Sequence, residues 1–215
     1  MAMMPSVDNN LLVGIFILSS GVYSMGEQRI VLAARDAAWR NNIKSILNRS
    51  GYYVVGEASD GLTALKMIRS RQPELVIIEP LLPGMDGLEV ARIVHEDKLA
   101  PVVLIGTTSQ DDLVEKAKRA NVFAFLISPI EESTLVPTVE LTITKYNELV
   151  KLESQVAELK ETLETRKIVE KAKGILMEKH DLTEPEAFNR MRKQSMNKRV
   201  SMRVIADAII LANNL

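Results

Sequence analysis

Short apolar runs alternate with amphipathic stretches between residues 29 and 130. The runs are almost continuous in apolar and β-branched residues, which is typical of parallel strands covered on both faces. The stretches between them repeat apolar residues near i, i+3, i+4 and i+7, as amphipathic helices do. This alternation predicts a doubly wound α/β domain with a five-stranded parallel sheet, whose ligand site lies at the carboxyl ends of the strands. The predicted strands are 29–34, 52–58, 74–79, 101–106 and 122–127, and the predicted helices are 37–50, 60–71, 86–97 and 109–120.

A different pattern begins after Pro129 and predicts one extended helix from residue 131 to about 179. This stretch has no glycine before Gly174. Its central part repeats Leu or Val at intervals of 3, 4, 3 and 4, which is the heptad seam of a coiled coil. A helix lying on its own domain is the alternative that the pattern leaves open. The five seam residues, which we expect to face a second copy of the chain, are Leu149, Leu152, Val156, Leu159 and Leu163.

Two shorter helices are predicted after the long one. Thr183 and Glu186 have the spacing of a capping box, with Pro185 in the first turn. Ser201 is the predicted cap of the last helix. The chain therefore ends in a bundle of three helices, the first of which is the end of the long helix.

Composition excludes several kinds of site. The chain of 215 residues has no cysteine, so it can form neither a disulfide nor a thiolate metal site. Its two histidines, His95 and His180, are far apart in the sequence, and we interpret them as ordinary helix residues. We therefore predict no metal site and no cofactor.

The formal net charge of −1 conceals a basic carboxyl-terminal region. Residues 164–203 contain eleven Lys or Arg and six Asp or Glu, a net charge of +5, so the rest of the chain carries −6. This asymmetry favours a negatively charged partner for the basic end, such as nucleic acid.

Residues 1–26 are interpreted as an extension before the first domain. Their apolar segment, 11–26, is too short for a bilayer span, and no Lys or Arg precedes it as in a signal peptide. Met25 is the predicted native initiator, because the first strand follows directly. A weak membrane anchor and a helix packed on the body are the alternatives left open.

The third predicted strand ends in an acid and a turn, in the sequence ELVIIEPLLPGMDG at 74–87. This sequence, and the order of elements over 27–130, resemble the receiver domain of response regulators, a CheY-like and flavodoxin-like fold. In that family an aspartate here accepts a phosphoryl group with the help of Mg²⁺-binding acids, a hydroxyl and a lysine. The resemblance implies that Glu79 stands at the phosphoacceptor position.

Four positions that carry this chemistry differ from the family pattern. The longer side chain of Glu79 displaces its carboxylate by about 1.5 Å relative to aspartate, enough to spoil an in-line geometry. Without the acidic pair after the first strand, Mg²⁺ loses most of its ligands. We therefore expect a pseudo-receiver that is not phosphorylated. The predicted degenerate pocket consists of Ala34, Arg35 and Asp36 after the first strand, Gly106 and Thr107 at the hydroxyl position, and Ser128 at the lysine position.

Arg35 is a candidate partner for Glu79, because the two residues follow neighbouring strands. A guanidinium can hold a carboxylate with two hydrogen bonds. We predict an ion pair between their side chains in place of Mg²⁺ and phosphoaspartate; the alternative is that Arg35 points to solvent. The family pattern also suggests a cis bond between Ser128 and Pro129, which the sequence leaves undecided.

The basic end, residues 164–215, closely resembles the ANTAR domain, an RNA-binding module of three helices in transcription antiterminators. The matching sequences are EKAKGILME at 170–178, EAFNRMRKQSMNKR at 186–199 and IADAII at 205–210. The order of the parts resembles that of antiterminators of the amidase, nitrate-assimilation and ethanolamine-utilisation type. A receiver domain comes first, a coiled-coil linker follows at 131–163, and an ANTAR domain comes last. The amidase type implies control by a sensor protein that binds the receiver.

Ten residues of this module form its predicted RNA surface. Lys167, Lys171 and Gly174 follow i, i+4, i+7 and share a helix face. A glycine inside a helix costs about 1 kcal/mol relative to alanine, which indicates the close approach of another backbone, either RNA or the neighbouring helix of the bundle. The other residues, suited to phosphate contacts and to stacking on loop bases, are Lys173, Arg190, Arg192, Lys193, Lys198, Arg199 and Arg203.

The second helix of this module also contains apolar residues. Phe188, Met191 and Met196 are predicted core residues, on the interpretation that they repeat at helical spacing. Phe188 is the only aromatic residue of the module, so we predict no aromatic platform for stacking on single-stranded bases.

Together these expectations describe a dimeric, cytoplasmic regulator, not an enzyme, that binds stem-loops in nascent mRNA leaders and prevents a terminator hairpin from forming. A homodimer would present two ANTAR modules to paired hairpins. Once one module is bound, the dimer raises the effective concentration of the other module at the second hairpin. Two alternatives stay open: a response regulator phosphorylated on Glu79, Asp86 or Asp36, and a protein-interaction scaffold.

Overall fold

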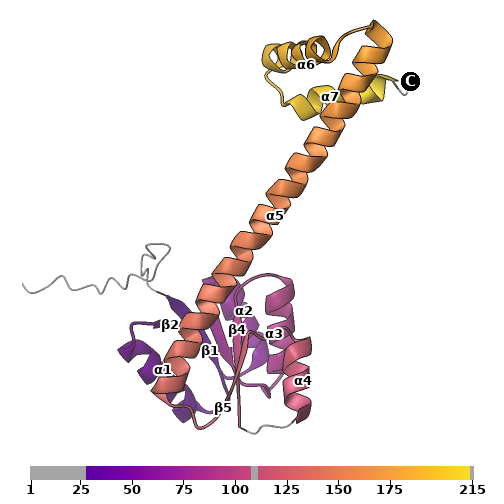
Figure 1. The fold of residues 1–215 in the computed structure, drawn as a ribbon. Helices are drawn as coiled ribbons and strands as arrows, with labels where there is room; N and C mark the ends of the chain where they lie inside the picture. The colour runs from indigo at the N-terminus through magenta and orange to yellow at the C-terminus, as the bar shows by residue number, and fades with distance from the viewer. Residues whose placement is uncertain (1–27, 108–110, 214–215) are drawn as a thin grey trace, which may run out of the picture. The chain divides into compact units, whose positions relative to one another are not determined.

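The computed structural model describes residues 28–107 and 111–213, so the predicted extension at 1–26 lies outside the described residues. The chain divides into two compact units after Ile143. The described part of the first unit alternates strands and helices, and that of the second unit is helical (Figure 1).

The first unit has the predicted elements, with bounds that differ by a few residues. Its strands are β1 (Arg29–Ala33), β2 (Tyr53–Ala58), β3 (Leu75–Ile78), β4 (Val102–Gly106) and β5 (Ala124–Ile127). Its helices are α1 (Ala37–Arg49), α2 (Gly61–Arg71), α3 (Gly87–Glu96), α4 (Asp111–Arg119) and the beginning of α5 (Glu132–His180).

All five strands are parallel, in the order β2-β1-β3-β4-β5. The predicted doubly wound fold is therefore confirmed. The strand order reverses between β1 and β3, and a crevice for ligands opens at such a point. Ala33 pairs with Ile78 in the register of β1 and β3, so the residues that follow, Ala34 and Glu79, meet at this crevice.

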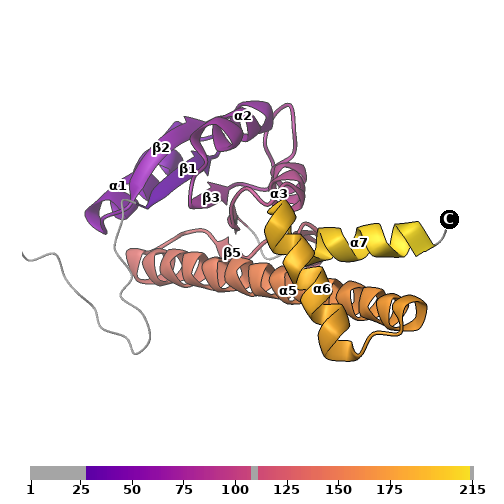
Figure 2. The same ribbon diagram turned by 90° about the horizontal axis from the view of Figure 1, so that it is seen from above.

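Alternate residues of each strand point to opposite faces of the sheet, and both faces are covered. Val31 and Ala33 pack in the core shared with α2, α3 and α4. Ile30 and Leu32 pack in the core shared with α1 and the first turns of α5. Figure 2 shows α2 and α3 on one side of the strands and α5 on the other.

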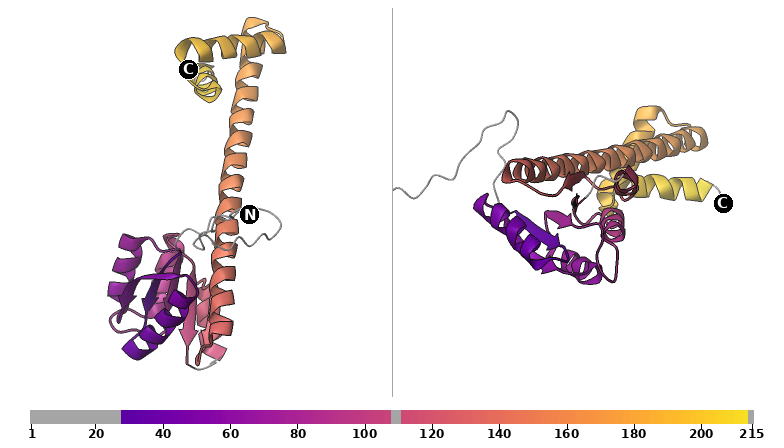
Figure 3. Two further views of the ribbon diagram at one scale, coloured as in Figure 1. Left: turned by 90° about the vertical axis from the view of Figure 1, so that its left-hand side faces the viewer. Right: turned by 90° about the horizontal axis from the view of Figure 1, so that it is seen from below.

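Helix α5 is one continuous helix of 49 residues, as predicted (Figure 3). Leu135, Val139 and Ile143 in its first turns are buried and complete the core of the first unit. These turns therefore pack with the first unit, beyond the predicted boundary at residue 130.

The second unit joins the end of α5 to α6 (Glu184–Lys198) and α7 (Met202–Asn213), and Figure 1 shows both beside its last turns. The Glu186 carboxylate accepts the backbone N–H and the hydroxyl of Thr183, and the Ser201 hydroxyl accepts the N–H of Val204, so both predicted helix starts are confirmed. The small core consists of Ala172, Leu176, Ala187, Met191, Ile205 and Ala206. Within 28–107 and 111–213, no helix is both long and apolar enough to cross a bilayer.

Candidate functional site

The crevice of the first unit is built around Glu79. Its backbone N–H donates to the carbonyl of Ala33 at 2.9 Å, which fixes the residue at the end of β3. A Cβ atom at Gly87 would lie 1.9 Å from the carbonyl oxygen of Glu79, so only glycine fits where the turn closes on α3. The carboxylate of Glu79 is half-buried, and its Oε2 accepts the backbone N–H of Arg35 at 3.0 Å.

The predicted ion pair between Arg35 and Glu79 is wrong. Among the described residues, no salt bridge joins their side chains, and Arg35 is exposed. The backbone N–H of Arg35 already reaches the carboxylate, so the guanidinium is not needed to hold it.

Two further acids near the crevice cap helices. Asp36 Oδ1 accepts the N–H groups of Ala38 and Trp39 at 2.7 and 3.3 Å. Asp86 Oδ1 accepts the N–H of Leu88 at 3.0 Å. Each carboxylate thus satisfies free donors at the start of a helix, α1 or α3.

Apolar side chains fill the space beside Gly106. A Cβ atom at this position would lie 3.1 Å from the ring of Phe125 and 3.2 Å from Leu113. The carbonyl of Gly106 accepts the N–H of Ser128 at 2.8 Å, and the Ser128–Pro129 bond is cis. The neighbouring Thr107 is exposed. The positions expected to carry a hydroxyl and a lysine are therefore a packed glycine and a half-buried serine.

The residues of this crevice do not fit the Mg²⁺ that receivers use. Ala34 and Arg35 supply no carboxylate, and Asp36 is engaged by the start of α1. Of the three acids described at the crevice, Glu79, Asp36 and Asp86, only Glu79 does not cap a helix, whereas Mg²⁺ needs an octahedral set of oxygen ligands that includes carboxylates. In the part of the chain that the structure describes, no three acidic or histidine side chains form a metal-binding group.

Arg40 is a residue of the crevice that the sequence did not reveal. Its Nη1 donates to the carbonyl oxygens of Ala34 and Arg35, and its Nε lies 3.7 Å from Glu57 Oε2. The side chain is largely buried. Arg40 therefore places a positive charge against the end of β1. In the sequence, only its position one helical turn after Asp36, the cap of α1, could have indicated this role.

In the second unit, six of the predicted RNA contacts are exposed cations. They have no ion pair or hydrogen bond to another side chain among the described residues. Unpaired cations need no internal bond broken before they meet phosphate. They are Lys171, Arg190, Arg192, Lys193, Lys198 and Arg199.

Two others form ion pairs within their own helices. Lys167 lies 2.7 Å from Glu164, and Arg203 lies 4.0 Å from Asp207. Exposed pairs of this kind contribute little stability, so both cations can exchange their partner for a phosphate at low cost.

Lys173 has a structural position and is not part of the exposed basic surface. Its side chain is only 6% exposed, and its Nζ lies 2.6 Å from Glu184 and 2.9 Å from Glu170. The hydrogen bond to Glu184 raises the pKa of Lys173 and lowers the pKa of Glu184. Lys173 therefore joins α5 to α6.

We expect this pair to make the second unit sensitive to acid. The pKa of Glu184 in the folded chain is below its ordinary value of 4.5, so the pair stabilises the fold above that pH and the stability is lost as the pH falls through the folded pKa. Lys173→Met should flatten this dependence, measured by amide hydrogen exchange at Ala187 and Met191 after correction for intrinsic rates. Lys179→Met, the same change at an exposed site, should keep it; equal profiles for the two variants would refute the role of Lys173.

Gly174 is exposed, and a Cβ atom there would meet none of the described residues within 4 Å. The explanation by close approach of a neighbouring helix within the bundle is therefore wrong. RNA remains the candidate for a backbone that approaches this face of α5.

Gly174→Ala should consequently have two effects of opposite sign. Helix propensity predicts that it raises the free energy of unfolding of the second unit by about 1 kcal/mol. If the RNA backbone approaches Gly174 closely, the added methyl group fills the space of this contact, and RNA binding becomes weaker. Chemical denaturation and RNA titration measure the two effects, and unchanged RNA affinity would remove Gly174 from the binding surface.

The predicted core positions in α6 are only partly correct. Met191 is fully buried, but Phe188 is 42% exposed and Met196 is 67% exposed. Five residues correspond to 500° of helix rotation, so Met196 does not share the face of Met191. Phe188 and Met196 instead add apolar surface beside the basic residues.

The five seam residues of α5 are all exposed, by 41 to 63%. An apolar stripe of this kind on a helix is a candidate protein-protein contact.

Two domain families match the chain. Residues 30–140 match the response regulator receiver domain, and residues 157–210 match the ANTAR domain. The first match covers more than half of the chain.

Relatives and a solved structure are similar to large parts of the chain. Transcriptional regulatory protein PdtaR of Mycobacterium tuberculosis (strain CDC 1551 / Oshkosh) is 38% identical over 183 residues, which are 85% of this chain and 89% of that protein. Chemotaxis protein CheY of Thermotoga maritima is 30% identical over 108 residues, 49% of this chain and 90% of that protein. The solved signal receiver domain of the response regulator NarL from Mycobacterium tuberculosis superposes with a TM-score of 0.51 at 26% identity, covering 56% of this chain and 97% of that one.

Proposed function

Because the chain belongs to the response-regulator family and joins a receiver domain to an ANTAR domain, we propose that it is an antitermination regulator that binds stem-loops in mRNA leaders. The observation that carries this proposal is the set of exposed cations on α6 and the turn after it, which have no partner among the described residues and lie within the segment that matches the ANTAR domain. Such cations neutralise phosphates, and arginine also stacks on unpaired loop bases.

A gel shift with leader RNA stem-loops at increasing salt tests this proposal. Binding through phosphates predicts retention at low salt and an affinity that falls steeply as salt rises. A protein-interaction scaffold is the second candidate, because Phe188 and Met196 are exposed beside the cations. The absence of any shift at low salt would favour the scaffold and contradict RNA binding.

We propose further that the receiver acts without phosphorylation. Support comes from the missing Mg²⁺ ligands at Ala34 and Arg35, the packed Gly106 and the hydrogen bond between Glu79 and the Arg35 backbone. Control then comes from a sensor protein bound to the receiver or from dimerisation through the seam of α5.

Incubation with acetyl phosphate should accordingly leave the intact mass of the chain unchanged. Glu79→Asp should also remain unmodified, since this variant still lacks the acids that hold Mg²⁺. Addition of one phosphoryl group to the unaltered chain would contradict the proposed mode of control.

A further inference from the structure

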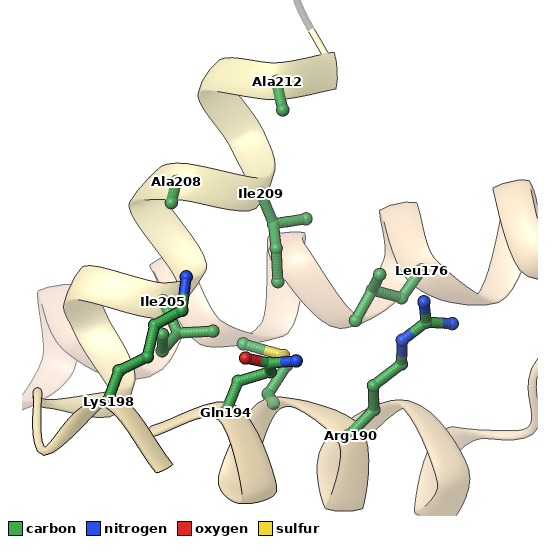
Figure 4. A pocket seen from close by; sticks show the side chains of 9 residues that line it. Leu176, Arg190, Gln194, Lys198, Ile205, Ala208, Ile209 and Ala212 are labelled. Atoms are coloured by element: carbon green, nitrogen blue, oxygen red, sulfur yellow. The ribbon is translucent and has the colours of Figure 1, made fainter. Parts of the chain in front are cut away.

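A hollow of about 300 Å³ lies between α6 and α7, with Leu176 of α5 at one side (Figure 4). Its apolar wall comes mainly from α7, through Ile205, Ala208, Ile209 and Ala212. We call it the α6–α7 hollow. All of its residues belong to the second unit.

Its polar rim comes from one face of α6. Arg190, Gln194 and Lys198 are spaced i, i+4, i+8 and project along the hollow in Figure 4. The two cations are about 12 Å apart along the helix axis and so flank Gln194. Among residues 28–107 and 111–213, none of the three side chains has a hydrogen bond or ion pair.

An apolar wall, a free amide and two free cations match a ligand with a flat apolar body, a hydrogen-bonding edge and negative charge on either side. A nucleobase within an RNA strand has these properties, and proteins read single-stranded RNA by taking splayed bases into such sites. A glutamine amide presents an N–H donor beside a carbonyl acceptor, the combination that reads an adenine edge.

We propose that the α6–α7 hollow receives one unpaired nucleobase of the bound RNA, while Gln194 reads its edge and Arg190 and Lys198 bind the adjoining phosphates. This inference rests on the proposed function and adds to it the place where sequence is read. A second copy of the chain fits less well: none of the described residues that line the hollow is acidic, and a two-fold contact through it would oppose like charges.

The test uses the full chain and a pool of RNA stem-loops with a randomised loop, from which the bound fraction is sequenced. The unaltered chain should enrich one base at one loop position. Ala208→Leu, which fills the hollow from an exposed position, should lower the affinity for the enriched RNA by about tenfold or more. Gln194→Ala should lower the base preference at that position about tenfold and change the overall affinity less.

Ala157→Leu is the matched control, the same change at an exposed position of α5 outside the hollow, and should bind as the unaltered chain does. Retention of no RNA by the unaltered chain would refute the proposed function itself. If Ala208→Leu and Gln194→Ala bind RNA with the affinity and base preference of the unaltered chain, the hollow does not receive a nucleobase, although the proposed function stands. A change of oligomeric state in Ala208→Leu at unchanged RNA affinity would also overturn this role of the hollow, by assigning the hollow to a protein contact.

Discussion

Arg192→Ala combined with Lys193→Ala is expected to lower the affinity of the chain for RNA stem-loops by about tenfold or more at about 0.15 M salt. Both side chains are exposed and without an internal partner among the described residues, so their removal leaves the fold of the second unit intact. Each lost phosphate contact should also reduce the slope of log affinity against log salt by about 1. RNA titrations at several salt concentrations measure both quantities.

Lys66→Ala combined with Arg71→Ala is the control, because it removes the same two kinds of charge from exposed positions of α2 in the first unit. We expect nearly unchanged affinity and an unchanged salt slope. If both double variants lose the same amount of RNA affinity, the overall charge of the chain drives binding. In that case α6 is not a specific RNA-binding surface.

Leu152→Glu combined with Leu159→Glu is expected to convert the proposed dimer of this chain into monomers. Both side chains are exposed in the single chain, by 58 and 63%, and burying a leucine in a dimer contributes about 1.5–3 kcal/mol. The Kd of the dimer should therefore rise by about 100-fold or more, measured by analytical ultracentrifugation. The affinity for RNA with two stem-loops should fall by about the same factor, because the second ANTAR domain is no longer tethered.

Ser154→Glu combined with Ala157→Glu adds the same charge to exposed positions of α5 outside the seam, and this variant should remain dimeric. If both double variants keep the oligomeric state of the unaltered chain, the heptad pattern does not mark a dimer contact.

The sheet was predictable because its strands are continuous apolar runs that few other structures accommodate. Ile30 to Ala33 and Leu75 to Ile78 are fully buried, and no polar residue interrupts them. The capped starts of α6 and α7 were predictable for a related reason, since the caps at Thr183 and Ser201 act on their own helix. The sequence therefore reveals structure best where the cause is local.

The details of the site depend on contacts between distant residues. Glu79 is held by the backbone N–H of Arg35, and a backbone donor leaves no trace in residue identity. Lys173 belongs to the same charge pattern as Lys171, but only Lys173 faces Glu184 across two helices. Whether another helix packs against Gly174 likewise depends on tertiary packing, which the spacing of residues in the sequence does not reveal.

RNA binding by this chain is tested most directly by ultraviolet crosslinking of the full chain to RNA in the cells that produce it, followed by sequencing of the bound transcripts. We expect leader segments with neighbouring stem-loops next to a terminator hairpin, recovered without a phosphodonor and lost with the Arg192→Ala/Lys193→Ala variant. Recovery of no RNA above the level of that variant would contradict RNA binding by this chain.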